Sequence, residues 1–155
     1  MQKTICSLYS GGGKLKFRLG TDEVRFINLF EMLTGAETKD CVINNERLTF
    51  VVDEGEIAQA IGKKGSNVRR VENKVNKKVD VIEFSRDPLQ FVRNMLHPIK
   101  PKTVYLSEKS SGEKVVNVQV ERRDRNLIFS NGERLYKRLK MFLSRYHQIS
   151  SVEVQ

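Results

Sequence analysis

Four consecutive residues near the middle of the chain, Gly62-Lys63-Lys64-Gly65, combine residue types that bind phosphate groups. Glycine lacks a Cβ atom, so the backbone can turn sharply and another chain can approach it closely. Amide N–H groups in such a turn, and at the start of a following helix, attract anions, and the two lysines add full positive charges. The tetrapeptide, which we call the lysine turn, therefore predicts a clamp for a chain of phosphates. Taken alone, it is equally typical of a surface turn between two helices.

The charge around the lysine turn supports a binding site. Residues 62–78 hold seven basic residues and one acidic residue, whereas residues 21–85 as a whole hold 10 basic and 12 acidic residues. A dense basic stretch in an otherwise acidic unit is more than solubility requires. Beside the turn, Ala58 and Ala60 together with Ile57 and Ile61 could form the floor of a groove for unstacked bases, and the sequence leaves open which of them point into the core. The candidate binding residues are Ile61, Gly62, Lys63, Lys64, Gly65, Arg69, Arg70 and Lys74.

The whole chain is basic and offers little for catalysis. Its 155 residues include 28 basic and 19 acidic residues, which give a formal net charge of +9, and its 39% of hydrophobic residues can form a core. The two histidines, His97 and His147, do not stand at metal-ligand spacing from cysteine or carboxylate pairs. Residues 10–14 lack the spacing of a nucleotide-binding loop. We therefore expect no enzyme, no metal and no cofactor, and we expect a polyanion as the partner.

The cysteines and the hydropathy pattern indicate the compartment. Cys6 and Cys41 are the two cysteines, and they give no disulfide framework. No window approaches 18 consecutive apolar residues, and the first ten residues lack the features of a secretory leader. We therefore expect a cytoplasmic protein that does not contact a membrane.

The patterning of residues 16–85 predicts a mixed unit of helices and strands. Apolar residues at helical spacing follow Thr21 and stop at Gly35, which is a typical helix end. Two apolar runs around the polar residues 44–46 predict a hairpin. A short helix before the lysine turn, a longer helix after it and a final strand at 79–84 complete the unit. The predicted order is helix, strand, strand, helix, helix, strand.

Residues 86–155 repeat this order, beginning with a helix at Asp87-Pro88. Ile61–Gly65 matches Ile128–Gly132 at an offset of 67 residues, and this internal repeat is the strongest architectural signal in the chain. We therefore predict an α+β fold with two tandem domains, each a three-stranded sheet packed against helices. The predicted boundaries are 1–15 for a flexible basic extension, 16–85 for the first domain and 86–155 for the second.

The arrangement around the lysine turn resembles a type II KH domain. The shared features are an isoleucine before the first glycine, an amphipathic helix on each side of the turn, a hairpin upstream and a closing strand. The resemblance implies two tandem KH domains. It also implies that the turn binds about four nucleotides of single-stranded nucleic acid through their backbone.

Longer stretches resemble archaeal NusA, a family of transcription elongation and termination factors. The stretches are residues 22–31, 33–36 and 54–68, and the resemblance extends over about residues 14–155. It implies a factor that binds nascent transcripts together with RNA polymerase. Bacterial relatives carry a further polymerase-binding domain and an S1 domain before the KH pair, for which this chain is too short. Direct contact with the polymerase therefore stays open.

The second half departs from the KH pattern at its loop. At the offset of 67, Phe129 replaces the first glycine and Ser130-Asn131 replace the two lysines, so a side chain stands where the backbone should approach phosphate. Two interpretations stay open: RNA continues across this basic face with Phe129 as a stacking platform, or Phe129 is buried and the charges are solvated. Arg134, Lys137 and Arg138 are the candidate RNA-binding residues of this half.

The residues and the resemblance together predict a single-stranded RNA-binding transcription factor that takes part in termination or antitermination. Its predicted partner is nascent RNA. An alternative is a KH module of the ribosome or of ribosome assembly, in which RNA or protein occupies the same surfaces permanently. A backbone clamp need not contact the 2′-hydroxyl group, so DNA stays open as a ligand. Base preference and oligomeric state stay open too, with a monomer favoured.

Overall fold

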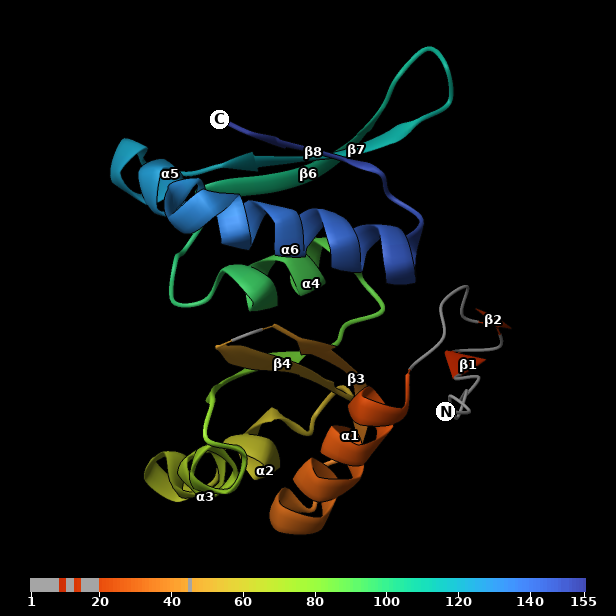
Figure 1. Ribbon diagram of the computed structural model, residues 1–155. Helices are drawn as coiled ribbons and strands as arrows, with labels where there is room; N and C mark the ends of the chain where they lie inside the picture. Colours follow the sequence, from red (N-terminus) through yellow and green to blue (C-terminus); the bar gives the residue numbers. More distant parts are fainter. Residues whose placement is uncertain (1–8, 11–12, 15–19, 45) are drawn as a thin grey trace. The chain divides into compact units, whose positions relative to one another are not determined.

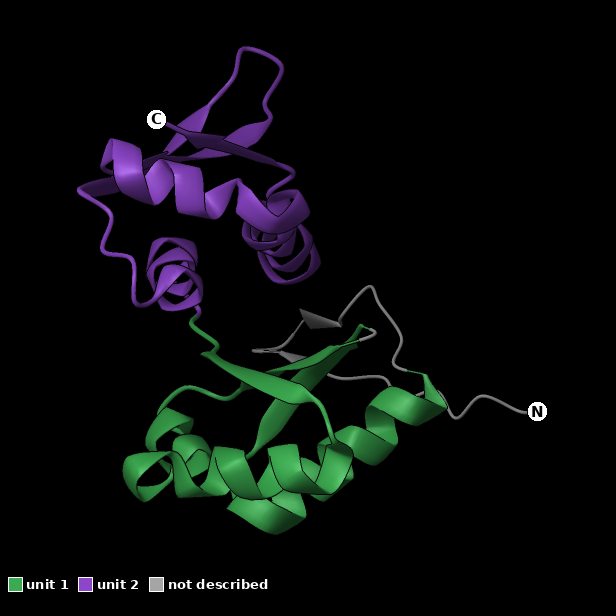
Figure 2. Ribbon diagram, turned by 60° about the vertical axis from the view of Figure 1, so that its left-hand side comes forward, with its two compact units in different colours: residues 1–85 green, residues 86–155 purple. Residues whose placement is uncertain are grey.

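The structure is a computed structural model that describes residues 9–10, 13–14, 20–44 and 46–155. Most of the predicted extension, residues 1–15, lies outside the described residues. The chain divides into two compact units, residues 1–85 and residues 86–155 (Figure 2). No helix among the described residues is long and apolar enough to cross a membrane. The mixture of helices and sheets confirms the predicted α+β class.

Unit 1 has the order α1, β3, β4, α2, α3, β5, with a short two-stranded ribbon of β1 and β2 before it. Its sheet has the order β3-β4-β5, with β3 antiparallel and β5 parallel to the central strand β4. The three helices lie on one face of this sheet (Figure 1). The bounds are Tyr9–Ser10 for β1, Gly13–Lys14 for β2, Thr21–Thr34 for α1, Thr38–Ile43 for β3, Arg47–Val52 for β4, Ile57–Ile61 for α2, Ser66–Val75 for α3 and Lys78–Glu83 for β5.

Helix α1 ends where the sequence predicts. Gly35 has a left-handed backbone with φ 77°, and its N–H donates to the carbonyl oxygen of Glu31. Glycine adopts this conformation without the steric cost that a Cβ atom imposes, so it is a favourable residue at a helix C-terminus. The chain then turns into β3, and α1 packs beside α2 and α3, the helices on each side of the lysine turn.

The core of unit 1 lies between its helices and its sheet. Phe30 of α1 and Phe50 of β4 are both fully buried, and their rings stack with centroids 4.2 Å apart. Helices α2 and α3 contribute Ala60 and Val71, which are fully buried as well. Because each helix turns an apolar side toward β4, burial of these side chains fixes the helices that flank the lysine turn.

Unit 2 has the order α4, β6, β7, α5, α6, β8, and its sheet repeats the pairing of unit 1. The central strand β7 is antiparallel to β6 and parallel to β8. The predicted start of its first helix is confirmed, because Asp87 caps the helix by accepting a hydrogen bond from the Leu89 N–H and Pro88 is the first helical residue. The bounds are Pro88–Leu96 for α4, Thr103–Glu108 for β6, Lys114–Gln119 for β7, Arg122–Ile128 for α5, Ser130–His147 for α6 and Ser151–Val154 for β8.

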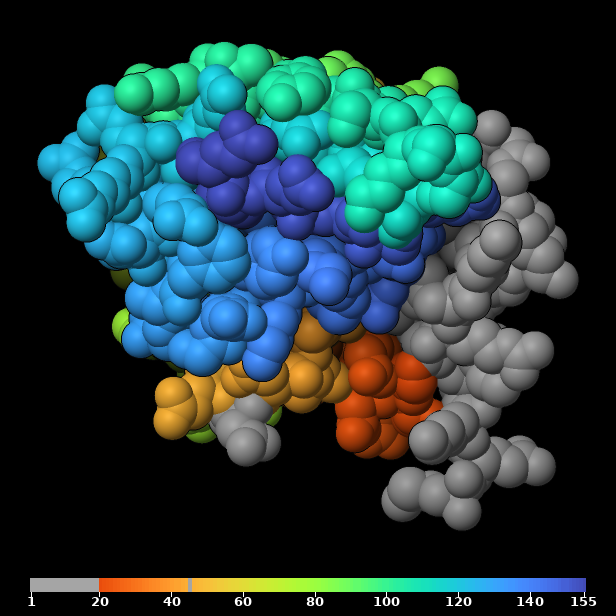
Figure 3. All heavy atoms as spheres, turned by 90° about the horizontal axis from the view of Figure 1, so that it is seen from above, coloured from red at the N-terminus to blue at the C-terminus, as the bar shows by residue number. Residues whose placement is uncertain are grey.

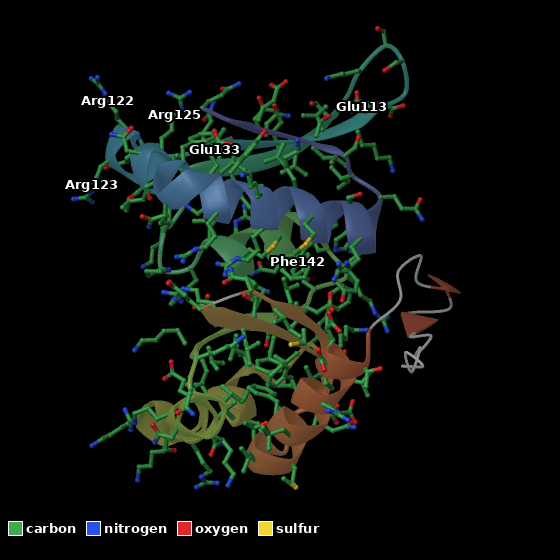
Figure 4. All side chains as sticks on the ribbon, viewed as in Figure 1. Glu113, Arg122, Arg123, Arg125, Glu133 and Phe142 are labelled. Carbon is green, nitrogen blue, oxygen red and sulfur yellow. The ribbon has the colours of Figure 1, made fainter. Side chains whose placement is uncertain are left out.

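The core of unit 2 is centred on α6. Phe142, Leu139 and Leu143 of this helix are fully buried, and the Phe142 ring lies 6.3 Å from that of Phe91 on α4. Figure 4 shows Phe142 on the side of α6 that faces α4. These apolar contacts hold α6 against the rest of the unit, so the residues at its start have a fixed framework.

The helices on each side of the turn align at an offset of 68 residues between the two units, so the predicted offset of 67 is wrong by one at this place. Fully buried Ala60 corresponds to fully buried Ile128, and Val71 corresponds to Leu139. The similar residues before the two turns favoured an alignment shifted by one residue. The buried positions decide the correct alignment.

The corrected alignment changes the counterpart of the lysine turn. Residues 62–65 correspond to Ser130-Asn131-Gly132-Glu133, and Phe129 corresponds to Ile61. Asn131, Gly132 and Glu133 have left-handed backbones with φ values of 54°, 70° and 61°, and the regular part of α6 follows them. Unit 2 therefore has a sharp turn at this place, but with Ser130 and Glu133 at the two glycine positions.

The Phe30–Phe50 stack leads to a prediction of how much stability unit 1 loses when its core is disrupted. Phe50→Ala removes a fully buried ring and leaves a cavity, so we expect a loss of about 3–5 kcal/mol in the free energy of unfolding. Met32→Ala on α1 is the control, because the Met32 side chain is 74% exposed and its loss should cost less than about 0.5 kcal/mol. Urea denaturation followed by circular dichroism measures both values. Equal losses in the two variants would contradict the assigned core.

Candidate functional site

The backbone of the lysine turn has positive φ angles at its two glycines, which adopt them without strain. Gly62 has φ 74° and ψ 174°, and Gly65 has φ 75°. A Cβ atom on Gly62 would lie 2.7 Å from Cγ of Asn67, closer than such atoms come. The Gly65 N–H donates to the Gly62 carbonyl oxygen at 3.2 Å, which closes the turn. The first glycine is therefore required twice, by its φ and by the packing of its neighbour.

The two lysines of the turn are exposed to solvent. Lys64 occupies a left-handed conformation with φ 55°, and neither lysine is buried. Within residues 20–44 and 46–155, no ion pair involves Lys63 or Lys64. Their charges are therefore not neutralised by neighbouring carboxylates and are available to an anion at the tip of the turn.

Two side-chain amides connect the turn to α1. Asn67 Nδ2 donates to the Gln59 carbonyl oxygen at 2.9 Å, and Gln59 Nε2 donates to the Thr34 carbonyl oxygen at 2.8 Å. The first bond joins α3 to α2 across the turn, and the second joins α2 to the end of α1. Sequence reasoning missed both residues, because a polar residue on a helix does not reveal which backbone group it contacts.

The other predicted basic residues lie on different sides of α3. A Cβ atom on Gly65 would lie 3.8 Å from an Arg69 guanidinium nitrogen, so Arg69 extends the charge of the turn. Arg70 instead donates to the Leu33 carbonyl oxygen of α1 at 3.4 Å, and Lys74 follows it one helical turn later. The structure thus brings Arg69 close to the turn and directs Arg70 toward α1.

The structure decides which of the apolar residues beside the turn face the core and which face solvent. Ala60 is fully buried in the core, so it cannot contact a ligand. Ile57 packs against the same core, whereas Ala58 is exposed and Ile61 is 38% exposed. Only one side of this short helix is therefore open, because consecutive residues of a helix point about 100° apart.

A polar hollow lies next to Arg69, between α3 and the start of β5. Its volume is about 560 Å³. Two of its groups are engaged with the backbone: Glu72 accepts a hydrogen bond from the Val79 N–H, and Lys77 donates to the Asn44 carbonyl oxygen. Amide side chains in the wall offer both donors and acceptors. The lining residues are Glu46, Arg69, Glu72, Asn73, Asn76, Lys77 and Lys78. Sequence reasoning did not find this hollow, because Glu46 lies far in the chain from its other lining residues, which fall within residues 69–78.

The basic residues predicted in unit 2 are spread along α6. Arg134 and Lys137 are exposed, whereas Arg138 is half-buried. Phe129 is half-buried too, and its ring lies 5.0 Å from the Tyr136 ring, so it packs within the unit. Glu133 places a carboxylate at the position that Gly65 has in unit 1 (Figure 4).

The side chains of His147 and Cys41 have structural roles. The His147 ring lies 5.5 Å from the Phe91 ring of α4. Cys41 is buried in β3, and burial raises the pKa of its thiol, so the thiol is held in its neutral form. Among the described residues, no group of three or more histidine, cysteine, aspartate and glutamate side chains is arranged to hold a metal ion.

Comparison with known proteins places the chain in a family. The family model for the KH domain matches residues 27–125. The chain is 39% identical to the probable transcription termination protein NusA of Methanocaldococcus jannaschii, over 90% of this chain and 75% of that protein. It is 30% identical to the protein of the same name from Halococcus morrhuae, over 90% of this chain and 99% of that one.

A solved structure has the same fold. The crystal structure of APE1850 superposes with a TM-score of 0.72 at 28% sequence identity, and the match covers 88% of this chain and all of that one, 100%. The sequence relatives and the KH match confirm the resemblance that the motifs indicate. The chain therefore belongs to the archaeal NusA family and contains a KH domain.

Proposed function

We propose that this chain binds single-stranded RNA as a transcription factor that acts in termination or antitermination, and that the lysine turn grips the RNA backbone. The observation that carries the proposal is the pair of exposed lysines, free of ion pairs within the described residues, in a glycine-flanked turn. The names of the relatives support a role in transcription rather than in the ribosome. The nascent transcript is the natural ligand, with RNA polymerase as its source.

The proposed grip has three parts that act on one RNA strand. The glycine backbone lets the sugar–phosphate chain approach closely, because no Cβ atom lies at Gly62 or Gly65. The start of α3 adds the positive end of its helix dipole, and Lys63 and Lys64 add full charges. Arg69 then continues the positive surface toward the polar hollow, whose amide groups suit the edges of unstacked bases.

We also propose that unit 2 is a second, degenerate KH domain. Its element order and sheet pairing equal those of unit 1, and it has a sharp turn at the equivalent place. The domain boundaries are then residues 16–85 and 86–155, after a basic extension. Arg134, Lys137 and Arg138 of α6 supply further positive charge for RNA.

Charge reversal in the lysine turn tests the proposal directly. Lys63→Asp together with Lys64→Asp replaces two charged contacts with repulsion, so we expect binding of a short RNA to weaken by at least roughly 100-fold, or about 3 kcal/mol. Fluorescence anisotropy with a labelled oligomer measures the affinity. The matched control, Lys109→Asp with Lys114→Asp on the β6–β7 hairpin, makes the same change in net charge and should bind normally. Retained affinity in the turn variant would refute the grip.

The salt dependence of binding counts the phosphates in the grip. Each phosphate contact on a single strand releases counterions and contributes about −0.7 to the slope of log affinity against log salt. About four clamped nucleotides therefore predict a slope of roughly −3 for the unaltered chain. A titration series between low and high salt gives the slope, and a matched DNA oligomer shows whether the 2′-hydroxyl group matters. A slope near zero is incompatible with a backbone clamp.

Replacement of the first glycine of the turn should affect both RNA binding and the stability of the fold. Gly62→Ala forces a Cβ atom against Asn67 at a positive φ, so we expect a loss of about 2–4 kcal/mol in unfolding free energy and much weaker RNA binding. Gly55→Ala is the control, since Gly55 also has a positive φ (84°) but nothing lies within 4 Å of its added Cβ. This control should cost about 1 kcal/mol and leave binding unchanged. Equal effects on RNA binding would show that the turn has no special role.

A further inference from the structure

The helix before the turn carries different charge in the two units. In unit 1, acidic residues lead into α2, and in unit 2 arginines dominate the equivalent stretch, so that Arg122 stands where unit 1 has Glu54. The offset of 68 residues, which the buried helix positions fix, makes this comparison possible. The charged residues are Asp53, Glu54 and Glu56 in unit 1, and Glu121, Arg122, Arg123, Asp124 and Arg125 in unit 2.

The arginines of α5 face solvent. Arg122, Arg123 and Arg125, which we call the α5 arginines, are all exposed. Figure 4 shows their side chains pointing away from the body of unit 2, and Figure 3 shows α5 (light blue) at the surface at one end of the unit. Only Ile128 of this helix is fully buried. Most of the helix surface is therefore available to a partner.

Their neighbours leave the arginine charges largely available. Arg123 Nε lies 4.0 Å from Asp124 Oδ1, and the Arg123 side chain is 83% exposed, so this pair contributes little. The Arg125 guanidinium carbon lies 5.8 Å from the Phe129 ring centroid, a cation–π contact that does not neutralise its charge. Leu127, which is 54% exposed, adds an apolar surface on the same helix.

The turn of unit 2 lacks the charge for a phosphate clamp. Where unit 1 has two lysines, unit 2 has Asn131 and Gly132, and Glu133 replaces the second glycine. The formal charge of the four residues is thus −1 instead of +2. A carboxylate at this position repels a phosphate that approaches the turn.

We propose that unit 2 contacts the RNA backbone through the α5 arginines instead of through its turn. The ligand is the phosphodiester chain of the RNA that the lysine turn holds, so the inference rests on the proposed function. Guanidinium groups form paired hydrogen bonds with phosphate oxygens, which a lysine does not, and this suits a surface without a glycine turn. Leu127 offers an apolar contact to a base on the same strand.

Neutralising two of the α5 arginines tests the inference. Arg122→Gln with Arg123→Gln is compared with Lys109→Gln with Lys114→Gln, which removes the same charge from the hairpin of the same unit. Each protein is titrated with a short RNA of about 4 nucleotides and a long RNA of about 20, because one KH turn holds about four nucleotides. Circular dichroism confirms that both variants fold, as expected for exposed side chains.

The expected result is specific to the long RNA. The arginine variant should bind it roughly 10- to 100-fold more weakly at low salt, and its salt slope should become less negative by about 1.4, or 0.7 for each lost phosphate contact. The short RNA should bind unchanged, and the lysine control should bind both RNAs like the unaltered chain.

Three outcomes would overturn the inference. An unchanged affinity and slope for the long RNA would show that α5 does not bind phosphate and serves another partner, such as an acidic protein surface. Equal weakening in the lysine control would show that net charge alone matters. Weakening that extends to the short RNA would place the arginines in the first site. The proposed function fails separately, when the Lys63→Asp, Lys64→Asp variant binds the short RNA normally.

Discussion

The candidate site depends on one backbone constraint, which is that the chain between α2 and α3 turns sharply within four residues. Such a turn needs positive φ angles, and glycine adopts them without the steric cost that a Cβ atom imposes. Gly62 meets this requirement beside Asn67, whose side chain occupies the space that a Cβ atom would need. The same absence of side chains that permits the turn also exposes its backbone and sets two lysines at its tip. The conformation of the lysine turn and its ability to bind an anion therefore both follow from its glycines.

The framework around the turn is rigid because the helices on both sides share one core. Phe30 and Phe50 stack at its centre, and Ala60 and Val71 anchor the two flanking helices. Unit 2 keeps this framework with a different core centred on Phe142, and it keeps a sharp turn at the same place. Its charges are distributed differently, however, so the framework fixes where a ligand-binding turn can lie and leaves its chemistry to surface residues.

The sequence predicts the fold well where local signals are strong. Gly35 ends α1 as expected, Asp87 and Pro88 begin α4, and the order of elements follows from apolar spacing. It fails where the answer depends on what a side chain contacts. Ala60 belongs to the core rather than to a groove, since a five-residue helix presents too few positions for its buried side to be read from spacing.

What the sequence determines by itself is the lysine turn, its basic surroundings and the repeat, because glycine, charge and apolar periodicity act locally. The tertiary structure decides the register of the repeat and the direction of each basic side chain. Arg69 reaches the turn while Arg70 reaches α1, although they are adjacent in the chain. A step of one residue rotates a side chain by about 100° around a helix, and only packing against the core fixes that rotation.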